Sequence, residues 1–436
     1  MKRIALMVCL AGAFLVSVAS GPSYAAEVDV LINKLVEKGV LSREEAGQLL
    51  NEMQKEGARQ ETTVKETAEK VAKETAEKTV KEGAQTWAKI PDWVNRISFK
   101  GDFRLRYQYE DKEKSGGTDV NRNRGRYRWR LGAVADVTED KKWQVGFGLA
   151  SGSGDPRSTN QTFTNDFETP DARIDYAYAQ FQPFEEWKMI GGQFKNPLYQ
   201  PKDLVWDGDI RPQGFASPLN FKINDQFGFF VTPALFVLQE FKSKEETAWM
   251  FALQPGVTIN PSKSSWIKLA GIWYYNTDVK GNSFAYSAGT NSTDANGNLI
   301  YDYSSLGLDG EVGFKFDSYV QHAALFGQFI KSDADNDNTG WLAGFKFGRK
   351  VKDLGDWEFK YNYRSLEKDA VLDFLPDSDF YGGDTNVEGH EVELKFGLAK
   401  QVYLALDYYR TKLIDHGPGK TDEPENLFQF DVNFKF

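Results

Sequence analysis

The sequence is poor in the residues that carry most covalent and metal chemistry. Its single cysteine, Cys9, lies in an apolar leader, so the mature chain is expected to have no disulfide, thiol nucleophile or thiolate metal site. Only three histidines are present, His322, His390 and His416, and they are far apart in the sequence. No G-x-S-x-G nucleophile motif accompanies them. We therefore expect a protein that is not an enzyme and that uses no cofactor and no metal.

Long hydrophobic runs are also missing after the leader. Residues 1–25 have the layout of a secretory signal, with Lys2 and Arg3 before an apolar stretch and Ala25 at a small-x-Ala cleavage site. No later stretch could form a transmembrane helix, and the mean hydropathy is −0.53. The net charge of −10 disfavours a nucleic-acid partner, because nucleic-acid binding needs a basic face.

Residues 26–86 lack any strand pattern and are predicted to be helical. Ser42 and Glu45 have the spacing of a capping box, which places a helix start just after a break at residues 39–41. Further on, K-E-T-A-E-K occurs at 65–70 and again at 73–78, with a small and polar seam at near-helical spacing. The segment is predicted to be periplasmic, and two readings stay open: a solvated helical spacer or a trimeric coiled coil.

From residue 87 onward the sequence alternates with a period of two. The last eleven residues, N-L-F-Q-F-D-V-N-F-K-F, place four phenylalanines and Val432 on one face of a strand and polar side chains on the other. Aromatic residues make up 14% of the chain. A terminal strand with one apolar and one polar face is typical of a transmembrane β-barrel, in which the polar face meets a water-filled lumen. Residues 87–436 are therefore predicted to form an all-β transmembrane barrel of antiparallel strands.

The links between the predicted strands alternate in length, as expected for a barrel with short periplasmic turns and long external loops. The pattern gives about sixteen strands, with fourteen or eighteen left open. The weakest part is residues 196–225, where one strand is predicted at 204–211. Short links fall near 138–142, 183–186, 260–264, 317–319, 349–355 and 399–401, and long links near 110–121, 151–172, 277–305, 367–387 and 413–425.

Arginines occupy every second position of one predicted strand and recur on the strand before it. Residues two apart on a strand point the same way, so these arginines are expected to line the lumen and to attract anions. Acidic residues elsewhere in the barrel could instead neutralise this wall and produce a transverse field. The predicted pore-lining set is Lys100, Arg104, Arg106, Arg122, Arg124, Arg126, Arg128 and Arg130, and the candidates for the opposing acidic wall are Glu311, Glu358, Glu391, Glu393, Asp407 and Asp431.

Residues 191–215 read G-G-Q-F-K-N-P-L-Y-Q-P-K-D-L-V-W-D-G-D-I-R-P-Q-G-F. The first part resembles phosphate-selective porins, and W-D-G-D-I-R-P-Q-G-F resembles the "putative porin" family of bacterial outer-membrane proteins. K-G-V-L-S-R-E-E-A in the helical segment also resembles that family. The candidate constriction-loop residues are Lys195, Lys202 and Arg211, with Asp207 and Asp209 as counter-charges. The alternative is a rigid loop that only packs inside the barrel.

The resemblance implies a diffusion channel of the outer membrane, forming a homotrimer in contact with lipid and lipopolysaccharide. We expect passive passage of small hydrophilic solutes with a modest preference for anions. Two alternatives remain: an envelope tether that touches the cell wall through residues 26–86, and a channel specific for a sugar or carboxylate. The second would use aromatic residues in the lumen, with Tyr403 and Tyr409 as candidates.

Overall fold

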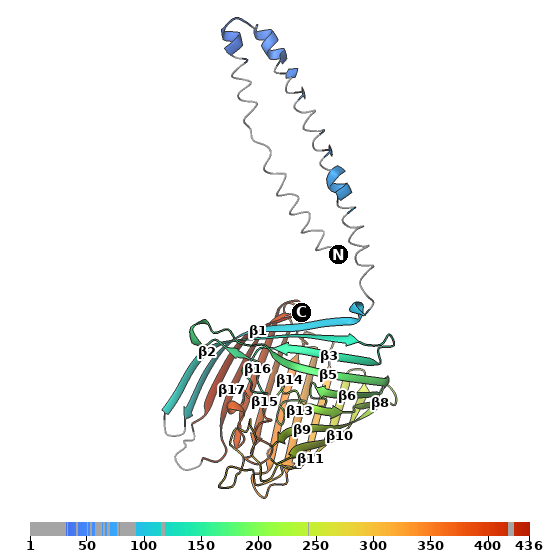
Figure 1. Ribbon diagram of the computed structural model, residues 1–436, viewed down its shortest axis with the longest axis vertical. Coiled ribbons are helices and arrows are strands. Elements are labelled where there is room, and N and C mark those ends of the chain that lie inside the picture. Colours follow the sequence, from blue (N-terminus) through green and yellow to red (C-terminus); the bar gives the residue numbers. More distant parts are fainter. Residues whose placement is uncertain are drawn as a thin grey trace. The chain divides into compact units, whose positions relative to one another are not determined.

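The computed structural model describes residues 93–436 except 115–117, 243 and 417–422, and only part of the chain between residues 32 and 78. The chain divides into two units, residues 1–91 and 92–436, which are described separately (Figure 1). Among the described residues, no helix is long and apolar enough to cross a membrane.

The N-terminal unit contains a helix end and a helix start close together. Gly39, with a φ of +70°, follows a helical stretch, and its N–H donates to Val36 while the N–H of Val40 donates to Leu35. This pair of hydrogen bonds is the Schellman ending that a left-handed glycine permits. Ser42 and Glu45 form the expected capping box, because the Glu45 N–H donates to Ser42 Oγ and the Ser42 N–H donates to Glu45 Oε2. The signal segment and most of the repeats lie outside the described residues, so signal peptide and coiled coil stay predictions.

The second unit is a closed antiparallel β-barrel of 16 strands. The barrel closes where β18 pairs with β1, and all neighbouring strands are antiparallel. The strand segments are β1 Ile97–Lys114, β2 Thr118–Asp136, β3 Trp143–Ala150, β4 Gln161–Thr162, β5 Arg173–Phe184, β6 Trp187–Gln193, β7 Gln213–Ala216, β8 Leu219–Lys222, β9 Phe227–Phe241, β10 Glu246–Ser262, β11 Ser265–Thr277, β12 Ser305–Lys315, β13 His322–Ser332, β14 Thr339–Gly348, β15 Trp357–Leu366, β16 Val387–Ala399, β17 Val402–Leu413 and β18 Glu425–Lys435.

The segments β7 and β8 together form one strand of the barrel wall, and β4 is not a wall strand. β7 and β8 both lie between β6 and β9, interrupted only at residues 217–218, and β4 pairs with just two residues of β2. The predicted count of about sixteen is therefore confirmed. The predicted strand at 204–211 is wrong, because that stretch lies in the link between β6 and β7 and the strand comes after it.

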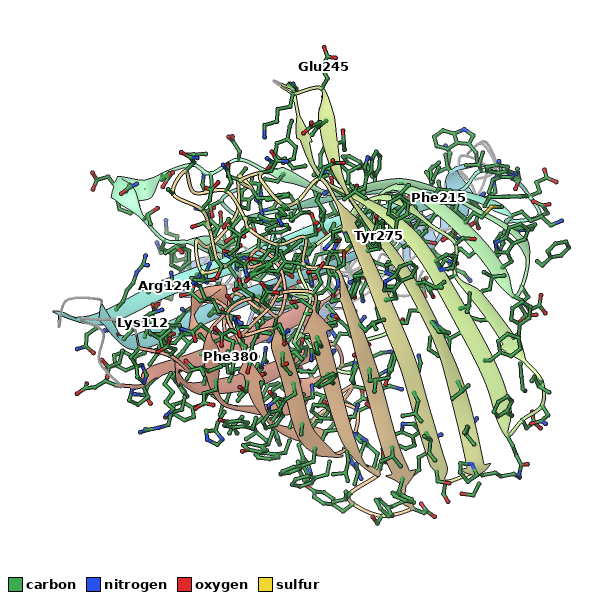
Figure 2. The ribbon with its side chains drawn as sticks, turned by 90° about the horizontal axis from the view of Figure 1, so that it is seen from below. Lys112, Arg124, Phe215, Glu245, Tyr275 and Phe380 are labelled. Carbon is green, nitrogen blue, oxygen red and sulfur yellow. The ribbon has the colours of Figure 1, made fainter. Side chains whose placement is uncertain are left out.

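The long links all lie at one end of the barrel, which we call the loop end, and the other end, the turn end, has only short links. The turns between β2 and β3, β5 and β6, β10 and β11, and β16 and β17 fall where the sequence predicts them. The predicted long link at 110–121 is wrong, because β1 and β2 extend through it and leave only residues 115–117 between them. Short links at the loop end also join β13 to β14 and β9 to β10, and Glu245 marks the projecting tip of the β9–β10 link in Figure 2.

The inner face of the barrel is not uniformly polar. Large apolar side chains on the outer face, such as Leu253, Trp273 and Leu325, are exposed, as expected for a surface that meets lipid. Toward the loop end, however, β9–β14 also carry apolar residues inward, and three long links fold inside and pack on them. The buried core includes Ala234, Phe236, Ala248, Met250, Ala252, Ile272, Tyr274, Phe326, Ile330 and Leu342 from these strands, Phe194, Leu198, Leu204, Val205, Trp206 and Ile210 from link 194–212, Val279, Phe284, Leu299 and Tyr303 from link 278–304, and Ala370, Val371, Leu372, Leu375, Phe380 and Tyr381 from link 367–386. It extends to Ala216 of β7 and to Leu366, Val387, Tyr409, Leu413 and Leu427 of β15–β18.

Candidate functional site

The arginines of β1 and β2 face one another across the two strands. Arg104 lies opposite Arg128, and Arg106 lies opposite Arg126, on the face that points into the barrel. Like charges placed directly opposite on neighbouring strands repel one another, so this arrangement needs carboxylates close by. Those carboxylates come from two sources.

The first source is the wall itself. Asp102, two residues before Arg104 on β1, lies 2.8 Å from both Arg128 Nη2 and Arg130 Nε. Asp431 on β18 lies 2.8 Å from Arg106 Nε and 3.4 Å from Arg104 Nη1. The strand register sets both contacts, because Asp431 is the cross-strand partner of Arg106 and Asp102 that of Arg130.

The second source is the loops that fold inside. Asp209, from link 194–212, lies 3.2 Å from Arg130 Nη1 and also accepts hydrogen bonds from the N–H and hydroxyl of Thr159. Burial alone would raise the pKa of Asp209, but Arg128 and Arg130 outweigh burial and hold the pKa well below its usual range. Asp379, from link 367–386, lies 3.0 Å from Arg106 Nη1. Two separate loops are therefore fastened to the arginine wall by ion pairs.

The remaining members of the predicted arginine wall differ in their pairing. Arg124 lies 3.2 Å from Glu110, whereas Arg122 and Arg126 make no ion pair with any described residue. Arg122 and Lys100 are exposed, and Lys100 sits near the turn end of β1 without a carboxylate partner in the described part of the barrel. The wall therefore keeps a small excess of positive charge after its ion pairs are counted.

Link 194–212 is held from its other side by apolar packing. Trp206 is buried, its indole N–H donates to the Tyr274 hydroxyl at 2.9 Å, and its ring meets Phe236 edge-on at 5.7 Å. Leu204 is fully buried, and its N–H donates to the Gln328 side chain. These contacts fix the position of the link against β9, β11 and β13.

The candidate constriction residues of this link lie in different surroundings. Lys195 is exposed, and Arg211 lies 3.2 Å from Asp175 at the start of β5. Lys202 is enclosed by carboxylates, 2.6 Å from Asp203 and 2.9 Å from Glu391. Burial alone would lower the pKa of Lys202, but Asp203 and Glu391 hold the pKa well above its usual value.

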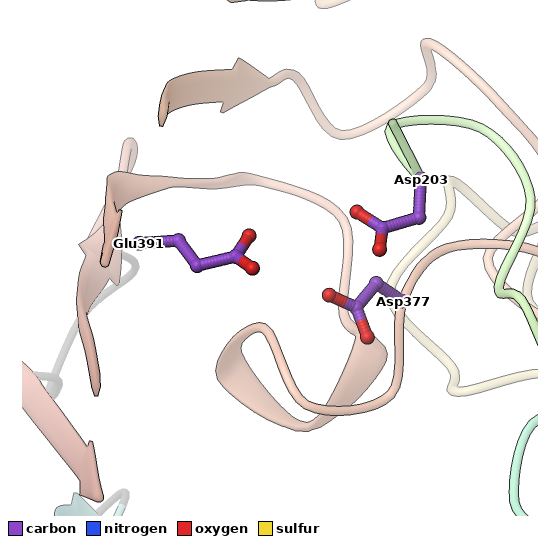
Figure 3. A group of neighbouring side chains, drawn as sticks. All are labelled: Asp203, Asp377 and Glu391. Atoms are coloured by element: carbon purple, nitrogen blue, oxygen red, sulfur yellow. The ribbon is translucent and has the colours of Figure 1, made fainter. Parts of the chain in front are cut away.

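Asp203, Asp377 and Glu391 come from two loops and strand β16, and their carboxylates point toward one another (Figure 3). Their nearest oxygens lie within 4.8 Å of one another, a spacing that a metal ion could use. Here Arg364 already reaches all three, at 2.8 Å from Asp203, 2.6 Å from Glu391 and 3.5 Å from Asp377. Together with Lys202, this makes the cluster a buried ion-pair network rather than a metal centre.

Two carboxyls of the inward-folded links, Asp377 and Asp207, are not fully neutralised by neighbouring cations. Burial, reinforced by Asp203, raises the pKa of Asp377 well above its usual value. Burial, reinforced by Asp209, raises the pKa of Asp207 to about 8. Among the described residues, the Asp207 carboxylate accepts hydrogen bonds from the backbone N–H groups of Ser378 and Asp209 and makes no ion pair, so it joins the two inward-folded links.

The proposed acidic wall does not face the arginines as a group. Glu311 pairs with Lys346 at 2.6 Å, Glu358 lies 3.1 Å from His322, and Glu393 lies between Lys360 and Lys395. Of the six acidic candidates, Asp431 contacts the arginines, while Glu391 belongs to the buried network and Asp407 is buried without an ion pair in the described residues. Tyr409 is buried against Phe380, whereas Tyr403 is partly exposed with Lys435 5.1 Å above its ring.

Sequence reasoning missed Asp102, Asp379, Asp203 and Arg364. Asp102 could have been predicted as a site residue from the sequence, because it lies two residues before Arg104 and so shares its inward face. Arg364 also lies on the inward face of an alternating strand. Asp379 and Asp203 lie in long links, where no periodicity indicates which side chains meet the wall.

Comparison with known proteins agrees with this architecture. A family model described as "Putative porin" matches residues 111–299 and 305–436. The structure is similar to that of OprB from Pseudomonas putida, with a TM-score of 0.51 and 14% sequence identity over 79% of this chain and 96% of that one. A variant of the Rhodopseudomonas blastica porin gives a TM-score of 0.44 and 10% identity over 78% of this chain and 100% of that one. No curated protein sequence matches the chain.

Proposed function

Because the chain belongs to the family described as "Putative porin", we propose that it is an outer-membrane channel through which small hydrophilic solutes diffuse passively, with a modest preference for anions. One observation carries the proposal: a closed barrel of 16 strands whose inner face holds an array of charged side chains. A barrel of this size is wide enough for an aqueous channel, even with loops folded into it.

The solute path is proposed to run along the side of the lumen formed by β1–β6. The opposite side is filled by the apolar core between the loops and β9–β14. Below the arginines, the inner faces of β2 and β3 carry Gly132, Gly146 and Gly148, and the rings of Tyr176 and Tyr178 from β5 lie directly over them. The glycines let these rings lie flat against the wall, and the partly exposed charged groups beside them favour water.

The preference for anions follows from the incomplete pairing of the arginine wall. Arg128 and Arg130 share Asp102 and Asp209, Arg104 and Arg106 share Asp431, and Arg106 also pairs with Asp379. Arg122 and Arg126 add positive charge without a carboxylate among the described residues. Uncompensated charge of one sign along a pore is a recognised source of ion selectivity.

The membrane setting and the assembly are part of the same proposal. The exposed apolar side chains of the outer face support contact with lipid. We propose a homotrimer with residues 26–86 in the periplasm, where the helical segment would reach the cell wall. Cross-linking in whole cells tests the trimer. Deletion of residues 27–85 separates the two roles, because a tether would be lost while conductance persisted.

The decisive experiment is single-channel conductance of the purified protein in a planar bilayer, with the reversal potential measured across a KCl gradient. Steady steps with a reversal potential on the chloride side are expected. Arg126→Glu should move the potential toward cations, because it replaces a lumen cation with an anion. Folded protein that gives no steps would refute the channel.

A further inference from the structure

Two guanidinium groups in the lumen converge on one turn without a carboxylate to neutralise them. Arg126 Nη2 lies 3.4 Å from the Ser158 hydroxyl, and Arg173 Nη2, from the first residue of β5, lies 2.9 Å from the Ser158 carbonyl oxygen. Neither arginine makes an ion pair with a described residue. Asp379, the carboxylate with the strongest electrostatic effect on Arg126, is already engaged by Arg106 at 3.0 Å.

The hydrogen bonding of both groups is incomplete. The Nε atoms of Arg126 and Arg173 are buried and have no hydrogen-bond partner in the described structure. A half-buried cation that lacks both an ion-pair partner and a full set of acceptors is less stable than a paired one, and such a site gains free energy from any anion that can enter. The same wall shows the contrast, since Arg106, Arg128 and Arg130 are all paired with carboxylates.

The surrounding turn is shaped to hold these groups. Gly152 has a φ of +119°, and a Cβ atom there would lie 2.6 Å from Arg173 Nη2 and 2.9 Å from the Ser158 carbonyl oxygen. Only glycine leaves the guanidinium its space at this point. Asn160 donates to the Ser158 hydroxyl from its backbone and from its side chain, at 3.4 and 3.3 Å, and its side-chain oxygen accepts from Arg104. Ser158 thus keeps its own hydroxyl proton for a further acceptor.

We propose that Arg126, Arg173 and the Ser158 hydroxyl form a binding subsite for a small oxyanion, such as a carboxylate or phosphate, on the solute path. Two guanidiniums that contact one residue are close enough to flank a single oxyanion, with charge-assisted hydrogen bonds from both sides and one from the hydroxyl. This inference rests on the proposed function, since it names the solute class that the channel retains in passage. Binding would be weak enough for release, as conduction requires.

The test measures the chloride conductance of single channels as inorganic phosphate is added, with acetate as the carboxylate probe. Phosphate should reduce the chloride current with saturation. Arg126→Gln and Arg173→Gln should each raise the half-blocking concentration roughly tenfold, as expected for the loss of a charge-assisted hydrogen bond. Arg122→Gln is the matched control, because it removes the same charge from the same face of β2 without touching Ser158. It should raise the half-blocking concentration far less than either variant, because its charge acts on the anion only through the general field of the lumen.

Gly152→Ala provides a second variant that displaces Arg173 without removing its charge, and it should weaken the block like Arg173→Gln. Gel migration with and without prior heating checks that each barrel has folded. If Arg122→Gln weakens the block as much as the other two, the effect is a general field and the subsite is refuted. If wild-type channels conduct but ignore both anions, the subsite is also refuted while the channel stands.

A wild-type protein that gives no steps would refute the channel instead. Calorimetric titration of phosphate into the folded, detergent-solubilised protein then judges the subsite alone. Heat released by wild type and absent in Arg126→Gln supports the subsite, and no heat from wild type overturns it.

Discussion

The loops inside the barrel are held in opposite ways on two sides of the lumen. On the apolar side, the inner faces of β9–β14, Trp206 and Leu204 are buried among hydrocarbon and aromatic side chains. On the ionic side, the inner faces of β18, β1 and β2, the same link is fastened by Asp209 and its neighbour link by Asp379. Link 194–212 therefore spans the lumen. Its buried residues Leu204 and Trp206 form an apolar root, and Asp209 forms a charged edge.

The two sides of the lumen differ in their role: one fixes the position of the loops, and the other sets the charge along the solute path. Apolar burial is non-directional and independent of pH and, at moderate concentration, of salt. Ion pairs lose part of their Coulomb energy to desolvation, and they change with the protonation of either partner. We infer that the apolar side sets where the loops lie, while the ionic side sets the charge that a passing solute meets.

The largest expected effect comes from removing the apolar root. Trp206→Ala should lower the free energy of unfolding by about 3–5 kcal/mol, the usual cost of deleting a buried Trp side chain. The cavity would also leave the Tyr274 hydroxyl without its indole donor. The measurement is a urea unfolding curve of the folded protein in detergent, repeated at high KCl, where the loss should be the same.

Trp273→Ala is the control, because Trp273 neighbours Tyr274 on β11 but points outward and is exposed. It should cost far less, since no cavity forms inside the barrel. Equal losses for the two variants would show that the link is not rooted on the apolar side.

The second effect tests the charged edge. Asp209→Asn removes the loop carboxylate that Arg128 and Arg130 share, while the asparagine oxygen can still accept from Thr159. We expect a loss of about 1–3 kcal/mol in the free energy of unfolding, typical of a hydrogen bond to a charged group. The reversal potential should move toward anions, because two guanidiniums lose part of their neutralisation.

Ser378→Ala is the matched control for loop disturbance without a change of charge, because its backbone contact to Asp207 persists. It should leave the reversal potential in place. A shift toward anions in this variant equal to that of Asp209→Asn would mean that loop displacement, not charge, sets selectivity.

The comparison also shows what sequence reasoning can reach. Period-two alternation and link length predict the barrel, its sixteen strands and the inward face of the arginines, because strand geometry is local. The parity of the strands required one strand in residues 196–225. Its position was misjudged because W-D-G-D-I-R lies in a link whose Trp206 is buried by tertiary packing and not by sheet pairing.

The sequence does contain a signal for the apolar side, but it is an apolar run and not a period-two alternation. Residues 227–238 read F-G-F-F-V-T-P-A-L-F-V-L, a nearly continuous apolar run, and such a run indicates a strand buried on both faces. The contacts of the ionic side were harder to predict, because their partners are distant in the sequence. Asp209 lies 79 residues after Arg130, and Asp379 lies 273 residues after Arg106. No pattern in a single sequence pairs a loop carboxylate with a particular strand position.

The smallest effect concerns pH and the one carboxyl that joins both links. Burial raises the pKa of Asp207 to about 8, while an unfolded aspartate has a pKa of about 3.9. The folded state therefore keeps a proton that the unfolded state has lost, so the contribution of Asp207 to stability is full below about pH 4 and is lost as the pH rises through about 8. Asp209, whose pKa is depressed, stays ionised throughout the alkaline range.

Raising the pH from 7 to 9 should thus ionise Asp207 beside the ionic side and move the reversal potential slightly toward cations. Asp207→Asn should reduce this shift, because asparagine cannot ionise, and Asp209→Asn should move the shift to lower pH, because Asp209 helps to raise the pKa of Asp207. An undiminished shift in Asp207→Asn would assign the titration to another group and leave the charged edge independent of Asp207. A smaller shift in Asp207→Asn would show that the ionic side responds to pH through a carboxyl whose proton is held by burial.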